Sequence, residues 1–174
     1  MNKIYAAAVC ILGIMVLLYS IYARIVSYRK KLTQKSFFLK TIVHEKSLVL
    51  QEMLILMSAD VQADQLFCNE FKMLCQEVLL AETVQDLAQR DSNVTQEIPA
   101  LFRMIEYLPS LKSNPSMVEL QGKLVSCDTR LEKAIIEYNN LVRLYNLVIS
   151  FFPARLIAYF LKAKKIDFFV LKNA

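Results

Sequence analysis

The sequence predicts an all-α protein in which an N-terminal transmembrane helix continues into a long antiparallel three-helix bundle. Three observations support this class. The 174 residues include only 2 glycines and 4 prolines, 56% of them are hydrophobic, and apolar positions recur at helical spacing along most of the chain. Because hairpins and tight turns need glycine, a sheet with many connections is excluded. A chain of this length accommodates one domain and an anchor.

The first element is the uncharged stretch 4–23, which reads IYAAAVCILGIMVLLYSIYA. A helix of this length, at about 1.5 Å per residue, spans the hydrocarbon core of a bilayer. We therefore expect a transmembrane anchor over residues 1–23. A cleaved signal peptide is the alternative, but its apolar part is shorter and ends at small residues, unlike Ile21-Tyr22-Ala23.

Positive charge follows the apolar stretch. Only Lys3 precedes it, whereas a basic cluster comes directly after it, made up of Arg24, Arg29, Lys30 and Lys31. Since basic residues flank the cytoplasmic end of membrane helices, we expect a single-pass protein with its bundle in the cytoplasm. The net charge of +5 indicates contact with the anionic head groups of the lipid bilayer. No nucleic-acid motif accompanies it, so no nucleic-acid partner is expected.

The bundle is predicted over residues 24–153, and its first helix runs on from the anchor to Met57. The helical spacing is carried by apolar residues at Leu32, Leu39, Ile42, Val49, Met53 and Leu56. A turn with an N-cap for the next helix is predicted at Ser58-Ala59-Asp60, because Ser and Asp side chains accept hydrogen bonds from free amides.

The middle of the bundle is predicted in two pieces. The first piece has an apolar stripe made up of Phe67, Phe71, Leu74 and Val78. The periodicity lapses at 90–93, where we expect a kink or short loop. Thr95 would then cap a restarted helix with Pro99 in its first turn. The prolines of the stretch 109–115 exclude continued helix and predict a turn.

The last helix is predicted from Ser116 to Phe152, where Pro153 ends it. Its second half has an apolar heptad at Leu131, Ile135, Tyr138, Val142, Tyr145, Ile149 and Phe152. Because the connections are short, this helix should run antiparallel to the first and return toward the membrane. The amphipathic segment 154–174, with lysines among Phe, Tyr and Leu, is predicted near the lipid surface. Packing under the end of the bundle is the alternative.

Residues suited to metal binding or catalysis are sparse. His44-Glu45 begins like a zinc-protease HExxH motif, but Leu48 stands where the second histidine belongs, and the chain has 1 histidine. We therefore expect no metal, no cofactor and no enzyme activity. A cluster of ionisable groups buried between helices would instead favour an enzyme.

Other polar and sulfur-containing residues have structural interpretations. The 4 cysteines form no CxxC pair, and Cys68 and Cys75 share one helical face, which predicts buried free thiols. Asp128, Glu132 and Glu137 stand among basic residues, a pattern typical of an exposed face with ion pairs within one helix.

Tyr-Asn occurs twice, seven residues apart, as Tyr138-Asn139 and Tyr145-Asn146. The tyrosines fall on the d phase of the heptad and the asparagines directly after it. Because a polar group at a helix seam must find a partner, the asparagines are predicted to fix the register of the helices. A binding surface is the alternative.

A proline turn, a long helix with both Tyr-Asn pairs and a Phe152-Pro153 stop occur in an order and spacing that resemble the LemA family. This resemblance implies a non-enzymatic helical bundle anchored in the bacterial inner membrane. It would act as a protein-interaction or scaffold module on an unknown membrane protein or on itself.

Two alternatives to this role stay open. One, implied by the resemblance, is an accessory subunit of an HtpX-type membrane metalloprotease. The other is a membrane-organising coiled-coil protein. The resemblance also extends to MamQ-like relatives, for which it implies a role in magnetosome formation.

Overall fold

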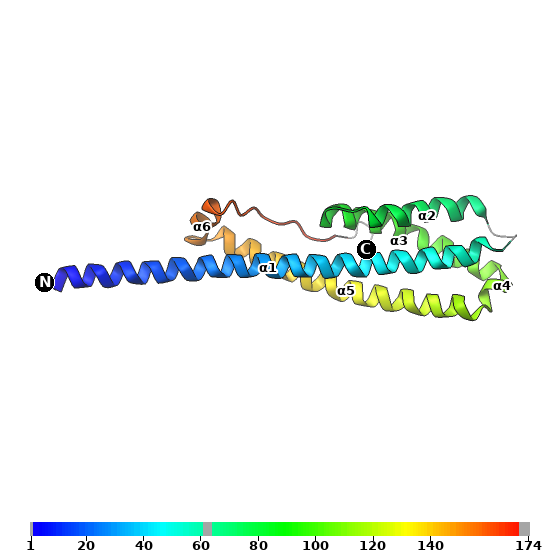
Figure 1. Cartoon of the computed structure of the whole chain (residues 1–174), viewed down its shortest axis with the longest axis horizontal. Helices are drawn as coiled ribbons and strands as arrows, with labels where there is room; N and C mark the ends of the chain where they lie inside the picture. The colour runs from blue at the N-terminus through cyan, green and yellow to red at the C-terminus, as the bar shows by residue number, and fades with distance from the viewer. Residues whose placement is uncertain (1, 61–63, 171–174) are drawn as a thin grey trace. The chain divides into compact units, whose positions relative to one another are not determined.

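The computed structural model describes residues 2–60 and 64–170, except for the side chains of 2–4 and 6–10. Helices follow one another through this part of the chain and no strand occurs in it, so the all-α class is confirmed (Figure 1). The last four residues of the predicted segment 154–174 lie outside the described residues.

The chain forms two compact units. The first unit comprises Met1–Lys35 and Glu137–Phe168, and the second unit comprises Ser36–Ile136 and Phe169–Ala174. The predicted division into an anchor, a bundle and a C-terminal segment refers to a membrane and stays a prediction.

Helix α1 (Asn2–Ser58) confirms the single helix predicted through the anchor and the first bundle helix. It is long and apolar enough to cross a membrane, and its residues 11–20 are all exposed. Farther along, a stripe of the same helix is buried, made up of Ile25, Leu32, Leu39, Ile42, Val43, Val49, Leu50, Met53 and Met57. The core of the protein itself therefore begins beyond the uncharged stretch.

In the second unit, α2 (Gln65–Leu79) begins after Asp64. The Asp64 carboxylate accepts hydrogen bonds from the N–H groups of Leu66 at 3.0 Å and Phe67 at 3.1 Å. The N-cap predicted at 58–60 is therefore wrong. The apolar face predicted for this helix is present, with Cys68, Phe71, Cys75 and Val78 buried.

Helix α3 (Val84–Tyr107) runs without a break through 90–93, so the predicted kink or loop there is wrong. The chain turns earlier, and the Thr83 hydroxyl caps α3 by accepting a hydrogen bond from the Asp86 N–H at 3.1 Å. Thr95 lies inside the helix.

The lapse in periodicity has a different cause. Asp91 is 1% exposed and Ser92 is 3% exposed, so polar side chains occupy the buried face of α3 at this point. The lapse in apolar periodicity at 90–93 therefore marks a buried polar layer in α3 and not a loop.

The predicted turn at 109–115 contains the short helix α4 (Pro109–Lys112) and leads into α5 (Pro115–Ser150). Most of the predicted heptad of α5 is buried, namely Leu131, Tyr138, Val142, Tyr145 and Ile149. Phe152 lies beyond the end of the helix and is 81% exposed.

In the first unit, α1 and α5 run antiparallel. Lys35 forms an ion pair with Glu137. Arg29 lies close enough to Tyr145 for its charge to oppose the rise that burial causes in the pKa of that phenol. Residues earlier in α1 therefore lie level with residues later in α5.

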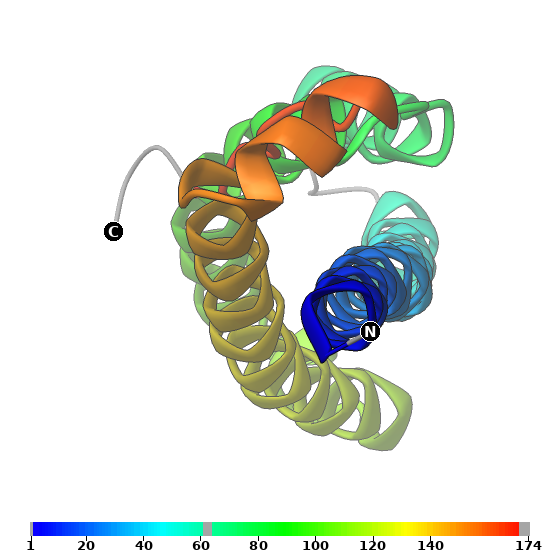
Figure 2. The same cartoon turned by 90° about the vertical axis from the view of Figure 1, so that its left-hand side faces the viewer.

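After Ser150 the chain bends by 97° into α6 (Ala154–Phe160). Figure 2 shows α6 lying across the end of α5. Beyond Lys162 the chain has no helix or turn through 163–168, and Figure 1 shows it there as an extended trace.

Replacing Thr83 with Ala should lower the free energy of unfolding by about 1 kcal/mol, because the Asp86 N–H loses its acceptor at the start of α3. Denaturant unfolding of the full chain in detergent measures this effect. Glu82→Ala, at the exposed neighbouring position, is the control and should have little effect. An unchanged midpoint for T83A would contradict the cap.

Candidate functional site

The second unit contains a buried charged layer centred on Lys46. This side chain is 3% exposed, and its ammonium group lies 3.4 Å from Asp91 Oδ1 and 3.1 Å from Asp128 Oδ1. It also donates a hydrogen bond to Thr95 Oγ1 at 3.0 Å. The layer therefore joins α1 to both α3 and α5.

Asp91 is the acidic group most deeply buried in this layer. Burial raises the pKa of Asp91, and the nearby Lys46 ammonium opposes this rise. Its second oxygen, Oδ2, has no hydrogen-bond partner in the described part of the chain. Lys46 is thus the main group that compensates the charge of Asp91.

Sequence reasoning missed this layer, although a signal was present. Lys46 stands seven residues after Leu39 and seven before Met53, in phase with the buried stripe of α1. Asp91 stands three residues before Val94 on the buried face of α3. A charged residue in phase with an apolar stripe predicts a buried charge, and two such residues predict a pair.

The prediction that the acidic residues of α5 form ion pairs within their own helix is wrong for Asp128 and Glu137. Asp128 contacts Lys46 and Glu137 contacts Lys35, and both partners lie on α1. These acidic residues connect helices.

The described part of the second unit contains three thiols, of which Cys75 lies next to the charged layer. Cys68 and Cys75 are buried and free, as predicted, and Cys127 is too, while the side chain of Cys10 lies outside the described residues. Burial raises the pKa of Cys75 to about 12, so this thiol is protonated and a poor nucleophile. The Ser47 hydroxyl donates to the Cys75 carbonyl at 2.6 Å, which adds a contact between α1 and α2.

His44 lies half-buried on α1, and its Nε2 has no hydrogen-bond partner among the described residues. Burial and the nearby Lys40 lower the pKa of His44. Within the same described residues, no group of three or more His, Cys, Asp or Glu side chains is arranged to hold a metal ion.

In the first unit, Asn146 binds the C-terminal segment. Its Nδ2 donates to the carbonyl of Ile166 at 2.8 Å, and the Ile166 N–H donates to Asn146 Oδ1 at 3.0 Å. The side-chain amide thereby satisfies both backbone groups of one residue, as a neighbouring strand would. The two bonds fasten the extended segment 163–168 to α5.

The other residues singled out in the sequence occupy different environments. Tyr138 and Tyr145 are buried, and Asn139 is half-buried. Pro153 stands directly before α6. The basic residues after the apolar stretch of α1 are all exposed, namely Arg24, Arg29, Lys30 and Lys31.

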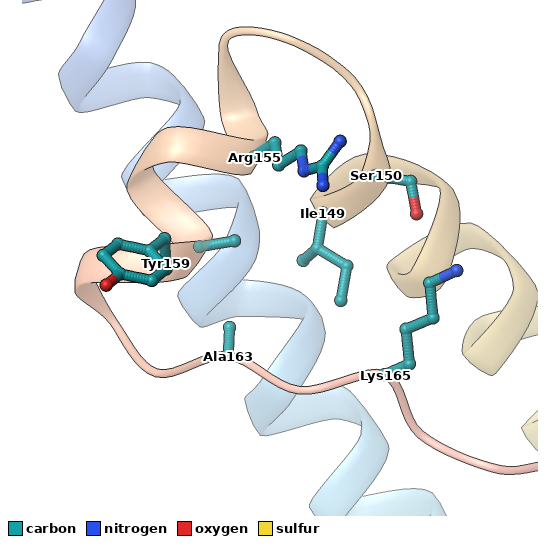
Figure 3. A pocket seen from close by; sticks show the side chains of 7 residues that line it. Ile149, Ser150, Arg155, Tyr159, Ala163 and Lys165 are labelled. Atoms are coloured by element: carbon teal, nitrogen blue, oxygen red, sulfur yellow. The ribbon is translucent and has the colours of Figure 1, made fainter.

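A cavity of about 410 Å³ opens where α5, α6 and the extended segment meet in the first unit (Figure 3). Arg155 and Lys165 are the charged residues that line it. The other lining residues are Ile149, Ser150, Ala158, Tyr159 and Ala163. In Figure 3 the ends of the Arg155 and Lys165 side chains lie on either side of Ser150 and Ile149.

A second cavity, of about 330 Å³, lies in the second unit between α1 and the start of α5. Ile55, Leu56 and Leu120 supply its apolar lining, and Glu52, Glu119 and Lys123 supply charged side chains. Lys123 and Glu119 pair with each other at 2.8 Å.

Comparison with known proteins supports the resemblance seen in the last third of the sequence. The model of the LemA family matches residues 19–174, which includes the first bundle helix. A comparison with curated proteins finds no match.

Replacing Lys46 with Met should destabilise the second unit by about 3–5 kcal/mol at neutral pH, because it leaves the Asp91 carboxylate buried without a counter-charge. Denaturant unfolding in detergent measures the loss. The double variant K46M/D91L is the control, and it should recover much of the lost stability because both buried charges are removed together. Equal instability of the single and double variants would contradict this account.

The stability of the K46M variant should depend on pH in a characteristic way. Asp91 has a folded-state pKa above its ordinary value of 3.8, so the stability it contributes is present at low pH and lost as pH rises through the folded pKa. Without Lys46 that pKa rises further. K46M should therefore regain stability relative to the unsubstituted chain as the pH is lowered from 7 toward 3.8, whereas K46M/D91L should not.

Replacing Asn146 with Leu should free the extended segment, because both of its hydrogen bonds to Ile166 are lost. We expect a local loss of about 1–3 kcal/mol. Hydrogen exchange in peptides that contain Ile166 should become faster, while exchange in α2 and α3 stays unchanged. Asn140→Leu, an exposed position on the same helix, is the control. Unchanged exchange at Ile166 in N146L would show that the segment is held by other contacts.

Proposed function

Because the chain belongs to the LemA family, we propose that it is a non-enzymatic, membrane-anchored helical-bundle protein that binds another membrane protein through α5. The membrane is the bacterial inner membrane in this proposal, crossed once, with the second unit in the cytoplasm. The support comes from α5, from α1 and from the buried charged layer.

The observation that carries the proposal is an outer stripe on α5, defined by Val118, Val125 and Ile136. These side chains are 56%, 63% and 55% exposed, respectively. Each stands two residues before a buried member of the core, namely Leu120, Cys127 and Tyr138. Residues two apart in a helix point about 200° away from each other. Helix α5 therefore has a buried apolar face and, opposite to it, an exposed one.

An exposed apolar stripe on a surface helix is a typical protein-binding feature. Gly122 and Thr129 stand on the same face between its members, and a Cβ added at Gly122 would meet nothing within 4 Å. The exposed Glu132, seven residues after Val125, also lies on this face, between Thr129 and Ile136. A helix from a partner could thus approach α5 closely at Gly122, between Val118 and Val125.

Anchoring is supported by α1. Its apolar residues 11–20 are exposed, which is costly in water and favourable in lipid. The exposed basic cluster of Arg24, Arg29, Lys30 and Lys31 supports a cytoplasmic second unit under the positive-inside rule.

A non-enzymatic role agrees with the way the buried charges are arranged. Lys46 and Asp91 are 2% and 1% exposed, and each is the close partner of the other. The Lys46–Asp91 pair is thereby closed to substrates, and Asp128, whose side chain is 48% exposed, connects the layer to α5. We therefore assign it to the stability and register of the bundle.

Crosslinking in native membranes followed by affinity purification tests the proposal. Val125→Lys should reduce partner recovery about tenfold or more, because it places a charge in the apolar contact. Ser126→Lys adds the same charge at the neighbouring exposed position and should leave recovery unchanged. Alkaline extraction checks the anchor, because an integral protein stays with the membrane fraction.

The identity of the captured partner separates the candidate roles. Recovery of a membrane metalloprotease would favour an accessory subunit, and recovery of the chain alone would favour a membrane-organising coiled coil. Equal recovery with V125K and with the unsubstituted chain would contradict binding through the outer stripe.

A further inference from the structure

The cavity in the first unit carries positive charge without a counter-charge. Arg155 and Lys165 line it, and no acidic residue is among the lining residues. Both side chains are exposed, and within the described residues neither has a hydrogen-bond or ion-pair partner. Two unpaired cations that line one cavity both attract an anion that enters it.

The whole first unit has the same imbalance. It contains 11 of the 21 basic residues of the chain but only 2 of its 16 acidic residues. One of those two, Glu137, is paired with Lys35. The other, Asp167, lies near Tyr138 and is not among the residues that line the cavity. An anion bound between Arg155 and Lys165 would therefore come from outside the described part of the chain.

Apolar side chains around the cavity indicate which kind of molecule carries that anion. Tyr159 lines it and is 80% exposed. Its neighbours in α6 and in the preceding bend also expose large apolar surfaces, namely Phe151 at 65%, Phe152 at 81%, Leu156 at 54% and Phe160 at 81%. Aromatic and basic side chains combined on a short helix are typical of the lipid interface, and a site for a soluble anion has no need of them.

The register of α1 and α5 places the cavity at the same depth as the end of the uncharged stretch. Arg29 lies near Tyr145, and the two helices run antiparallel in this unit. Five residues farther along α5, Ser150 is therefore level with about Arg24 on α1. Figure 1 likewise shows α6 at the same position along the horizontal axis as the blue N-terminal part of α1.

We propose that this cavity binds the phosphate group of an anionic phospholipid, with Arg155 and Lys165 as its ligands. Arg155 offers the planar donor pair that matches two phosphate oxygens, and Lys165 supplies a second charge. The volume of about 410 Å³ suits a head group. The assignment rests on the proposed membrane anchoring for its biological setting.

The test uses the full chain in non-ionic detergent and soluble dihexanoyl lipids, titrated by calorimetry. Dihexanoyl-phosphatidylglycerol should bind about tenfold or more tightly than dihexanoyl-phosphatidylcholine. The double variant R155Q/K165Q should lose this preference. The variant R143Q/K164Q is the matched control, because it removes one Arg and one Lys from the same unit outside the cavity, and it should keep the preference.

Three results would overturn the proposal. They are equal binding of the two lipids, a preference that survives in R155Q/K165Q, and an equal loss in R143Q/K164Q. Inorganic phosphate is a further arm, and binding as tight as that of the anionic lipid would identify a site for a free anion. Circular dichroism confirms that the variants are folded, and Arg155→Lys should retain part of the preference because it keeps the charge.

This experiment is independent of the proposed function. Soluble lipids in detergent require neither an anchored chain nor a partner on the outer stripe. A chain that is extracted at alkaline pH would contradict anchoring and leave the measured lipid preference intact. Loss of the preference in the unsubstituted chain would contradict the lipid site and leave partner capture intact.

Discussion

The buried ammonium group of Lys46 is the constraint on which the second unit depends. A charge on the apolar stripe of α1 is tolerated only where acceptors surround it, and Asp91, Asp128 and Thr95 supply them from α3 and α5. Apolar contacts alone permit neighbouring helices to slide by a turn at modest cost. Three acceptors around one ammonium group permit a single alignment, so this layer fixes the register of helices that the stripe merely brings together.

The helical spacing of apolar residues predicted most of the fold, because these residues are the ones that α1, α2 and α5 bury. The same reasoning failed at 90–93, where a polar residue in phase with the stripe reads as an interruption. Asp91 belongs to the buried face of α3, yet its side chain resembles that of a loop residue. The start of this helix was also predicted at the wrong threonine. Thr83 and Thr95 have the same capping chemistry, and only the position of the preceding turn distinguishes them.

The residues of the candidate sites were less predictable for a related reason. Asn146 was recognised from the Tyr-Asn repeat, but its partners are the N–H and carbonyl of Ile166. Almost every residue has these backbone groups, so the residue types alone do not predict that Ile166 is the partner of Asn146. The cavity beside it is built from the end of α5, from α6 and from an extended segment. Its existence depends on the 97° bend, an angle that a proline permits but does not specify.

Charge is divided between the units in a way that the net value of +5 conceals. Since the first unit holds 11 basic and 2 acidic residues, the remaining 10 basic and 14 acidic residues belong to the second unit. An anionic surface therefore attracts the unit that contains the apolar part of α1 and repels the unit that carries the outer stripe. This repulsion favours an outer stripe that stays accessible in water. Under the two proposals above, this distribution would hold α6 at the head groups and leave α5 accessible to a protein partner.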